Sequence, residues 1–376
     1  MRDLNRRHFF LGVAAAAAAR RTASAQSANG SIQTALIGSG GRGQTLLRGV
    51  LLQPEAKVTA ICDIKPDRLD QAATLAARDK PTTYRDYKEL LENPYIDAVY
   101  IASPCDLHVE MAIAALAAGK HVYCEKPVGI TPESIGRLVK AVASAKTVFQ
   151  VGQQLRYQPH RREIIERIHD GTAGRVVMVK AQRHASDDLD HDGRSKDWFF
   201  FAERSGDVIV EMSVHNLDVC NWAVDSLPAR AAGFGGALVW PDQPPGRTNM
   251  DGYTLSYEYA NGVKLSYTQV FFHPRGLPGG GQYTYVYTTE GAVDLEEGMY
   301  YPRARDAEPV KLNKTEPDNE RDRNLNIAGF FDCVRTGKKP LAGIREGATG
   351  ALTAILGREA IYQKKVMEWS EFGVEI

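Results

Sequence analysis

The chain has 376 residues, more than one ordinary domain needs, and this length predicts two domains with a core each. Hydrophobic residues make up 43% and charged residues 24%, as in ordinary globular proteins. The 46 basic residues balance the 46 acidic residues, so no net charge draws the chain to nucleic acid or to an anionic membrane. A small molecule is therefore the expected partner.

The first 25 residues have the pattern of an export signal. Arg6 and Arg7 precede an apolar run at 9–19, and the small-residue sequence ASA follows at 23–25. A bilayer span needs about 20 apolar residues, so this run predicts a removable signal and no membrane span in the mature protein. The arginine pair resembles a twin-arginine signal, although an amphipathic or disordered tail is the alternative. It predicts a periplasmic or secreted protein that is exported folded, with a tightly bound cofactor.

Residues 32–152, after a polar linker at 26–31, alternate short β-rich runs with helical runs. This alternation predicts an α/β domain with a doubly wound parallel sheet, the Rossmann architecture. Strands are expected at 32–38, 57–63, 97–103, 120–126 and 147–152, and helices at 40–52, 65–79, 108–119 and 131–145.

From residue 153 to residue 376 the pattern changes to longer alternating runs followed by helices. It predicts an α+β domain with a large, mostly antiparallel open sheet, and Asn261-Gly262 predicts a hairpin turn. Strands are expected at 174–182, 230–240, 253–272 and 283–297, and helices at 324–337 and 346–365. Two loops rich in Gly, Asp and Pro, at 184–198 and 273–282, are either walls of a site or solvated connections.

Gly38, Gly40 and Gly43 form a GxGxxG motif between the first strand and the first helix. Such glycines allow a tight turn and let backbone N–H groups approach a pyrophosphate at the helix N-terminus. Asp63 follows about 20 residues later at the end of a strand, where a carboxylate binds the adenosine ribose. These features together predict dinucleotide binding.

Asp63 favours NAD over NADP, because its carboxylate repels a 2′-phosphate. Lys65 and Arg68 lie close behind it in the sequence and weaken that preference, so NADP stays an alternative. Arg42 either touches the pyrophosphate or is a solvated residue at the start of the helix.

The segment Glu125-Lys126-Pro127 follows a strand directly. In a doubly wound sheet, ligands bind beyond the carboxyl ends of the strands. An ammonium there can hold and polarise a hydroxyl that is being oxidised. The alternative is that Lys126 lies on the surface in a salt bridge with Glu125.

The chain resembles the glucose-fructose oxidoreductase, inositol dehydrogenase and MocA family from Ile32 to its carboxyl terminus. The resemblance rests on GxGxxG, on SPCDLHVEMAIAALAAGKHVYCEKP at 103–127 and on QLRY at 154–157. It implies that Lys126 is the lysine of the catalytic site, and that the second domain's sheet pairs subunits into a homodimer or homotetramer. It places these residues at the cofactor: Gly38, Gly40, Gly41, Arg42, Gly43, Asp63, Ser103, Glu125 and Lys126.

The family also has an aspartate followed four residues later by a histidine. Here SGDVIVEMSVHNLDVCNW places Glu211 at the aspartate position, followed by His215 and Asp218. On one helix this spacing puts Glu211 and His215 on one face, with Asp218 a turn further on. His215 is then the catalytic base for the hydroxyl proton, unless it is a core histidine. Glu211 either orients His215 or contacts a sugar hydroxyl.

The remaining candidates belong to the substrate site or to the packing around it. Arg156 and Tyr157 are either substrate contacts or packing at the domain junction, and Asp218 and Trp198 are further expected substrate contacts. His108 is expected to be structural. No metal is expected, because the five cysteines form no CxxC pair and lie in apolar or helical segments.

The expected function is NAD(P)-dependent oxidation or reduction of a hydroxyl or anomeric carbon of a pyranose sugar, a sugar derivative or a cyclitol. One alternative is a redox glycosidase, which cleaves a glycoside through a transient keto-sugar while NAD is recycled. A second alternative is a non-catalytic sugar or nucleotide sensor, although a sensor needs neither Lys126 nor His215.

Overall fold

The computed structural model describes residues 30–186 and 198–376. The predicted export signal and most of the linker after it lie outside the described residues, as does most of the loop predicted at 184–198. Within the described part of the chain, no helix has the length and apolar character needed to cross a membrane.

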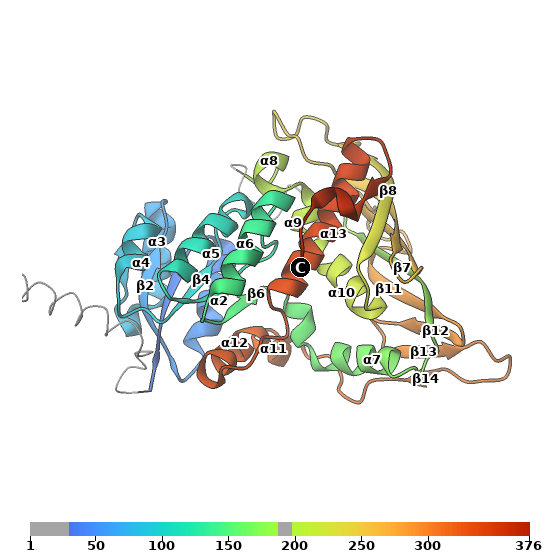
Figure 1. The fold of residues 1–376 in the computed structure, drawn as a ribbon, viewed down its shortest axis with the longest axis horizontal. Coiled ribbons are helices and arrows are strands. Elements are labelled where there is room, and N and C mark those ends of the chain that lie inside the picture. Colours follow the sequence, from blue (N-terminus) through green and yellow to red (C-terminus); the bar gives the residue numbers. More distant parts are fainter. Residues whose placement is uncertain (1–29, 187–197) are drawn as a thin grey trace, which may run out of the picture.

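The first domain is built on a six-stranded parallel sheet of order β3-β2-β1-β4-β5-β6 (Figure 1). This strand order is the Rossmann order, as predicted. Its central strands are continuous apolar runs because helices cover both faces of the sheet. The strands are β1 (Ile32–Ile37), β2 (Ala56–Cys62), β3 (Thr82–Tyr84), β4 (Ala98–Ile101), β5 (His121–Cys124) and β6 (Phe149–Val151).

The helices of this domain begin at the positions that their capping residues favour. Thr131 accepts a hydrogen bond from the Ser134 amide at the start of α6, and Asp86 caps α4 in the same way. The helix predicted at 65–79 ends earlier, at Leu75, and a short 3₁₀ turn follows. The helices are α2 (Gly41–Leu51), α3 (Pro66–Leu75), α4 (Tyr87–Glu92), α5 (His108–Ala117) and α6 (Pro132–Ser144).

The second domain has a nine-stranded sheet of order β14-β13-β12-β11-β7-β10-β9-β8-β15. Adjacent strands are antiparallel except for β7 and β10, which are parallel, so the sheet is mixed and mostly antiparallel, as predicted. The strands are β7 (Val176–His184), β8 (Pro228–Gly236), β9 (Gly252–Tyr259), β10 (Lys264–Val270), β11 (Gly281–Thr288), β12 (Gly291–Asp294), β13 (Met299–Pro302), β14 (Val310–Lys311) and β15 (Met367–Glu368).

Alternating burial gives this sheet an inner face and an outer face. On β9 and β10 every second side chain is buried, and the hairpin between them turns at Asn261 and Gly262, as predicted, with Gly262 at a φ of +85°. Helices α10 (Val214–Val224) and α13 (Ile344–Tyr362) pack on the inner face. Helix α12 (Leu325–Thr336) packs instead on α2 and the core of the first domain. The other helices of this half of the chain are α7 (Pro159–His169), α8 (Ala202–Ser205), α9 (Val208–Glu211) and α11 (Asn319–Asp322).

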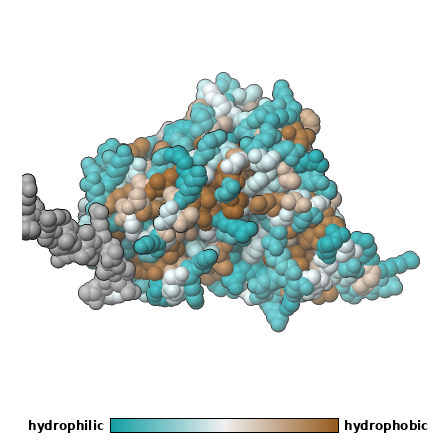
Figure 2. Space-filling view, in the orientation of Figure 1, coloured by the Kyte–Doolittle hydropathy of each residue, from teal (hydrophilic) through white to brown (hydrophobic). Residues whose placement is uncertain are grey.

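Helix α13 lies between the two domains (Figure 1). It packs against α6 and β6 of the first domain and against α10 and β8 of the second. One hydrophobic core therefore runs from Val128 and Ile135 through Leu352 to Leu255. Hydrophilic side chains cover much of the outside, with hydrophobic ones showing between them (Figure 2).

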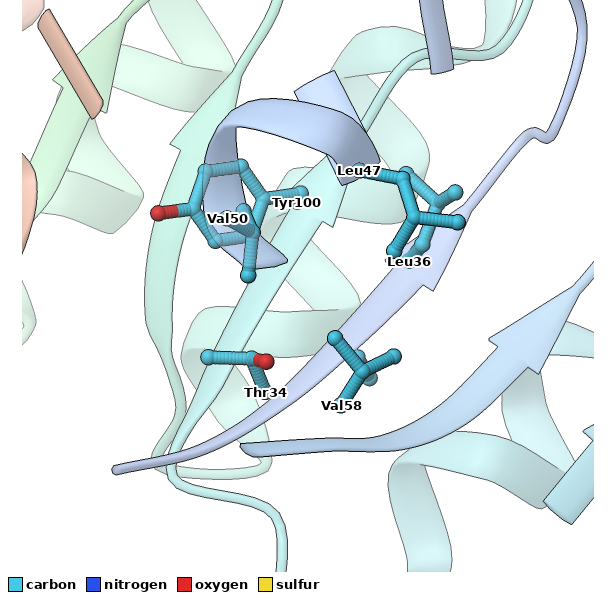
Figure 3. Close-up of a pocket in the computed structure, with 7 residues that line it drawn as sticks. Thr34, Leu36, Leu47, Val50, Val58 and Tyr100 are labelled. Atoms are coloured by element: carbon cyan, nitrogen blue, oxygen red, sulfur yellow. The ribbon is translucent and has the colours of Figure 1, made fainter. Parts of the chain in front are cut away.

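A small cavity lies inside the first domain, under α2 (Figure 3). Its volume is about 10 Å³, which is room for one water molecule at most. Its lining is almost entirely apolar: Thr34, Ala35, Leu36, Leu47, Val50, Val58 and Tyr100. This cavity is a packing defect between helix and sheet rather than a ligand site.

Candidate active site

The glycine-rich loop leaves no room for a side chain at Gly38 or at Gly43. Gly38 has a φ of +88°, and a Cβ there would lie 2.6 Å from the backbone of Ala102. A Cβ on Gly43 would lie 1.9 Å from the Gly38 carbonyl oxygen. Gly40 is the N-cap of α2 and Gly41 its first residue, and a Cβ on Gly41 would meet nothing within 4 Å. The space beside Gly41 at this helix start is therefore open, which leaves room for a pyrophosphate next to the N–H groups of the first turn.

Asp63 is fixed beside this loop at the end of β2. Its Oδ2 accepts hydrogen bonds from the Ser39 amide at 2.6 Å and the Ser39 hydroxyl at 3.0 Å, and its Oδ1 accepts from the Lys65 amide at 2.9 Å. The carboxylate is thus held in place, with 8% of the residue exposed. Arg68 also reaches the loop, since its guanidinium lies 3.5 Å from the position of a Cβ on Gly40. This placement fits an adenosine ribose at Asp63 with Arg68 nearby.

We expect Asp63→Ala to weaken NAD⁺ binding by roughly 10- to 100-fold, because a charged hydrogen bond is lost. NADP⁺ should bind as well as before or better, since the repulsion of its 2′-phosphate is removed. Fluorescence titration with both dinucleotides measures the two dissociation constants. Equal weakening of both would contradict a role in ribose recognition and would assign Asp63 to loop structure alone.

Arg42 and Glu125 form an ion pair between the glycine-rich loop and the end of β5. Arg42 Nε donates to Glu125 Oε1 at 2.8 Å, and its Nη2 donates to Gln154 Oε1 at 2.8 Å. Glu125 is 3% exposed and also accepts from the Lys126 amide at 3.3 Å. The alternative of a salt bridge between the side chains of Lys126 and Glu125 is therefore wrong, because Glu125 points toward Arg42.

Lys126 instead joins the two domains. Its Nζ donates to the Glu211 backbone oxygen at 2.6 Å and to Glu211 Oε1 at 2.9 Å. Only 14% of the Lys126 side chain and 17% of the Glu211 side chain is exposed. The predicted lysine and carboxylate thus meet at the domain junction, at the carboxyl edge of the parallel sheet.

His108 holds the backbone around Lys126. Its Nδ1 lies 2.7 Å from the carbonyl oxygen of Pro127, and its Nε2 lies 2.9 Å from that of Ser103. Burial lowers the pKa of His108, so its neutral ring donates to one of these two oxygens. It therefore ties the loop of Ser103 to the loop of Lys126, as expected of a structural residue.

His215 lies in the first turn of α10 and is only partly buried. Its Nδ1 is inaccessible to solvent and has no hydrogen-bond partner among the described residues. Burial lowers the pKa of His215 well below its usual value, and the nearby cations Lys126, Arg183 and Arg42 lower it further. At neutral pH the imidazole is therefore uncharged and able to accept a proton.

The prediction of one helix through Glu211 and His215 is wrong. Helix α9 ends at Glu211 and α10 begins at Val214, with a turn between them. The Ser213 hydroxyl in this turn hydrogen-bonds to Tyr253 and to Gln269 of the sheet. These tertiary contacts end the first helix, so Glu211 bonds to Lys126 and not along a helix face to His215.

Arg156 and Asp218 form a buried ion pair with each other. Arg156 Nε and Nη2 both donate to the Asp218 carboxylate, at 2.8 to 3.1 Å, and the guanidinium lies 5.1 Å from the ring centre of Trp222. Burial raises the pKa of Asp218, and Arg156 counters part of that rise. This pair fits packing at the domain junction.

Two further expected substrate contacts also pack against protein. A Cβ on Gly329 of α12 would lie 2.5 Å from the Tyr157 ring, and Trp198 stacks edge to face on Phe199 with ring centres 6.0 Å apart. In the described part of the chain, no hydrogen bond or ion pair joins these side chains to Lys126 or His215. Substrate contact by Arg156, Tyr157, Asp218 and Trp198 stays a prediction.

We expect Asp218→Leu to lower the free energy of unfolding by about 3–5 kcal/mol, because Arg156 is left as an unpaired buried charge. The double variant Arg156→Met with Asp218→Leu should regain most of this loss, since neither charge then remains. Urea unfolding followed by tryptophan fluorescence measures both. If Asp218→Leu lowers the free energy of unfolding by less than about 1 kcal/mol, the ion pair of Arg156 and Asp218 contributes little to stability.

The sequence analysis missed Arg183, whose positive charge helps to lower the pKa of His215. The signal was present in the alternation of β7, where Val179 and Ala181 are buried and Arg183 shares their face.

The described residues contain no group of three or more His, Cys, Asp or Glu side chains that could hold a metal ion.

Residues 32–153 match the NAD-binding Rossmann domain of the GFO/IDH/MocA oxidoreductases, and residues 162–294 match the C-terminal domain of the same family. The chain belongs to the GFO/IDH/MocA oxidoreductase family. Together the two matches cover well over half of the sequence, in the same order as the two sheets.

Named relatives of this GFO/IDH/MocA chain include sugar and cyclitol enzymes. It is 26% identical over 206 residues to myo-inositol 2-dehydrogenase of Thermotoga maritima, covering 54% of this chain and 58% of that protein. It is 34% identical over 159 residues to a glycosyl hydrolase family 109 protein of Stenotrophomonas maltophilia, covering 40% and 35%. The matched part therefore spans less than two thirds of these curated relatives.

Solved structures show the same fold over nearly the whole chain. A levoglucosan dehydrogenase in complex with NADH superposes with a TM-score of 0.77 at 20% identity, covering 90% of this chain and 99% of that chain. At this level of identity the likeness establishes the two-domain fold, and the function must be argued from the site.

Proposed function

We propose that the protein is an NAD(H)-dependent oxidoreductase that acts on a CH–OH group of a sugar, a sugar derivative or a cyclitol. The observation that supports this most directly is the Lys126–Glu211 pair at the edge of the parallel sheet that also carries the glycine-rich loop, with the Lys126 charge helping to keep His215 uncharged. Relatives named as inositol and levoglucosan dehydrogenases support the substrate class.

The residues present fit NAD. The glycine-rich loop admits no side chain at Gly38 or Gly43, the helix start at Gly41 faces open space, and Asp63 is placed for a ribose. Ser103 and Glu125 would flank the cofactor, with Glu125 holding Arg42 near the pyrophosphate. Bound NAD⁺ supplies the hydride acceptor. A tightly bound cofactor and use of NADP are further proposals that dinucleotide titration would decide.

The protein's own groups handle the oxygen and its proton. The Lys126 ammonium donates a hydrogen bond to the substrate oxygen, which favours the developing negative charge on it. His215 takes the hydroxyl proton as the carbon loses its hydride. Glu211 binds Lys126 and so fixes the position of the ammonium. In the reductive direction the same proton returns from His215.

The test is to mix the purified protein and NAD⁺ with a panel of free sugars, cyclitols and aryl glycosides. Reduced nicotinamide and released aglycone are followed together. A dehydrogenase accumulates reduced nicotinamide in step with substrate oxidised and leaves the glycosidic bond intact. Absence of any nicotinamide reduction across the panel would contradict the proposal.

A redox glycosidase is the second candidate, and the match to the glycosyl hydrolase family 109 protein favours it. In this reaction an oxidised sugar hydroxyl becomes a ketone, the acidified neighbouring C–H loses its proton, the aglycone is eliminated, and water adds before the ketone is reduced again. Aglycone release without lasting reduction would identify this chemistry. Sugar binding without either signal would favour the sensor alternative.

We further propose export through the twin-arginine route and assembly into a homodimer or homotetramer. The second sheet's outer face supports the assembly, since Phe234 is 83% exposed and Tyr287 and Tyr301 are also exposed there. Light scattering on the eluting protein measures the oligomer, and a reporter fused after residue 25 tests export.

A further inference from the structure

We propose that Arg183 is a carboxylate-recognition residue of the substrate site, so that the preferred substrate is an acidic sugar such as a uronate. This inference rests on the proposed function, because it names the substrate class of the same site.

Strand geometry puts Arg183 on the inner face of the second sheet. Val179 and Ala181 alternate with it along β7, and both are buried on that face. Arg183 pairs in register with Gln269 of β10 and with Gln282 of β11. Gln269 is fully buried on the same inner face, so the two side chains are neighbours across adjacent strands.

This place on the sheet lies under the start of α10. Gln269 Oε1 accepts a hydrogen bond from Ser213, and His215 follows Ser213 by two residues. Helix α10 packs on β7, and the positive charge of Arg183 is one of the causes that lower the pKa of His215. The sheet register thus places Arg183 under the helix start that carries the proposed base.

Arg183 differs from the other cations around the site because they have carboxylate partners. Lys126 binds Glu211, Arg42 binds Glu125, and Arg156 binds Asp218. The Arg183 side chain makes no hydrogen bond or ion pair with any residue in the ranges 30–186 and 198–376. A partly buried guanidinium loses hydration, and the carboxylate of a bound substrate would compensate that loss.

A second donor lies beside it. Gln269 Oε1 accepts from Ser213, Tyr253 and Tyr267, which assigns the other end of the amide as the donor. That Nε2 is buried and has no partner among the described residues. The Arg183 guanidinium and the NH2 group of Gln269 together suit a carboxylate, which carries one negative charge and accepts two parallel hydrogen bonds. A phosphate dianion carries a second negative charge, which the single charge of Arg183 would not neutralise.

The experiment compares matched pairs of substrates, namely glucuronate with glucose and galacturonate with galactose, with glucose 6-phosphate as the other anion. The variant is Arg183→Met, and the control is Lys180→Met, an exposed cation on the outer face of the same strand. Turnover with NAD⁺ gives kcat/KM, and calorimetry on protein saturated with NADH gives binding without turnover. Thermal unfolding checks that each variant is folded.

We expect the wild-type protein to prefer the uronate of each pair. Arg183→Met should lower kcat/KM and affinity for the uronate by roughly 10- to 100-fold, while values for the neutral sugar change less than about threefold. Lys180→Met should change neither. Uronate binding that is lost in Arg183→Met supports the inference even if no sugar is oxidised, in which case only the proposed reaction fails.

Three results would overturn the inference. The first is a wild-type preference for the neutral sugars, and the second is an equal loss for acidic and neutral sugars in Arg183→Met, which would make Arg183 structural. The third is a preference for glucose 6-phosphate over both uronates, which would assign the position to a phosphate.

Discussion

Lys126→Met is expected to lower kcat for hydroxyl oxidation by roughly 10²- to 10⁴-fold, the range measured for a positioned donor at a reacting oxygen. The reason is geometric. Lys126 Nζ is held by the backbone and side-chain oxygens of Glu211, at 2.6 and 2.9 Å, at the edge of the sheet where ligands bind. Its third N–H bond can then point at the substrate, and methionine removes that donor while keeping the length of the side chain.

The measurement is steady-state kinetics with the best substrate of the panel. Lys140→Met, on the exposed surface of α6, is the matched control and should keep full activity. Dinucleotide affinity, measured by fluorescence titration, should stay within a few-fold in both variants because the phosphate cradle is untouched. A kcat of Lys126→Met within threefold of the wild-type value would show that Lys126 has no catalytic role.

His215→Asn is expected to lower kcat by a similar factor and to change the pH profile. Burial and the charges of Lys126 and Arg183 hold the pKa of His215 well below 6.5. The base is deprotonated above that lowered pKa and protonated below it. The rate of oxidation by the wild-type protein should therefore be independent of pH near neutrality and should fall only as the pH drops through the lowered pKa of His215.

The acid limb of the wild-type profile should disappear in His215→Asn, since the group that titrates has been removed. Asparagine fills a similar space and keeps a polar group against the sheet, so the fold is preserved. The profile of kcat/KM between about pH 4 and pH 8 measures this. An unchanged acid limb in the variant would assign the titration to another group, and a wild-type limb centred above 6.5 would contradict the environment of the imidazole.

The sequence predicted features that depend on local pattern. The glycines of the first loop, Asp63 at the end of β2 and Lys126 at the end of β5 follow from strand periodicity and from the rule that places ligands at the carboxyl edge of the sheet. Thr131 as a helix cap and Asn261-Gly262 as a hairpin turn follow from local hydrogen bonding and backbone freedom.

Features that depend on tertiary contacts were not predictable in the same way. Lys126 pairs with a residue 85 positions away, so its choice of Glu211 over the adjacent Glu125 reflects how the domains dock. The break before α10 results from Ser213 bonding to the sheet. The short strands β13, β14 and β15, at or next to the edges of the second sheet, have too few residues to show an alternating pattern.

The central claim is that Lys126 and His215 act on a sugar oxygen while nicotinamide is reduced. Stopped-flow absorbance in a single turnover tests it most directly, because both a dehydrogenase and a redox glycosidase must form reduced nicotinamide within the first turnover. The account predicts that signal in the wild-type protein with at least one sugar, and a rate at least 100-fold slower in Lys126→Met. Equal rates in the two proteins, or no reduction with any sugar, would contradict it.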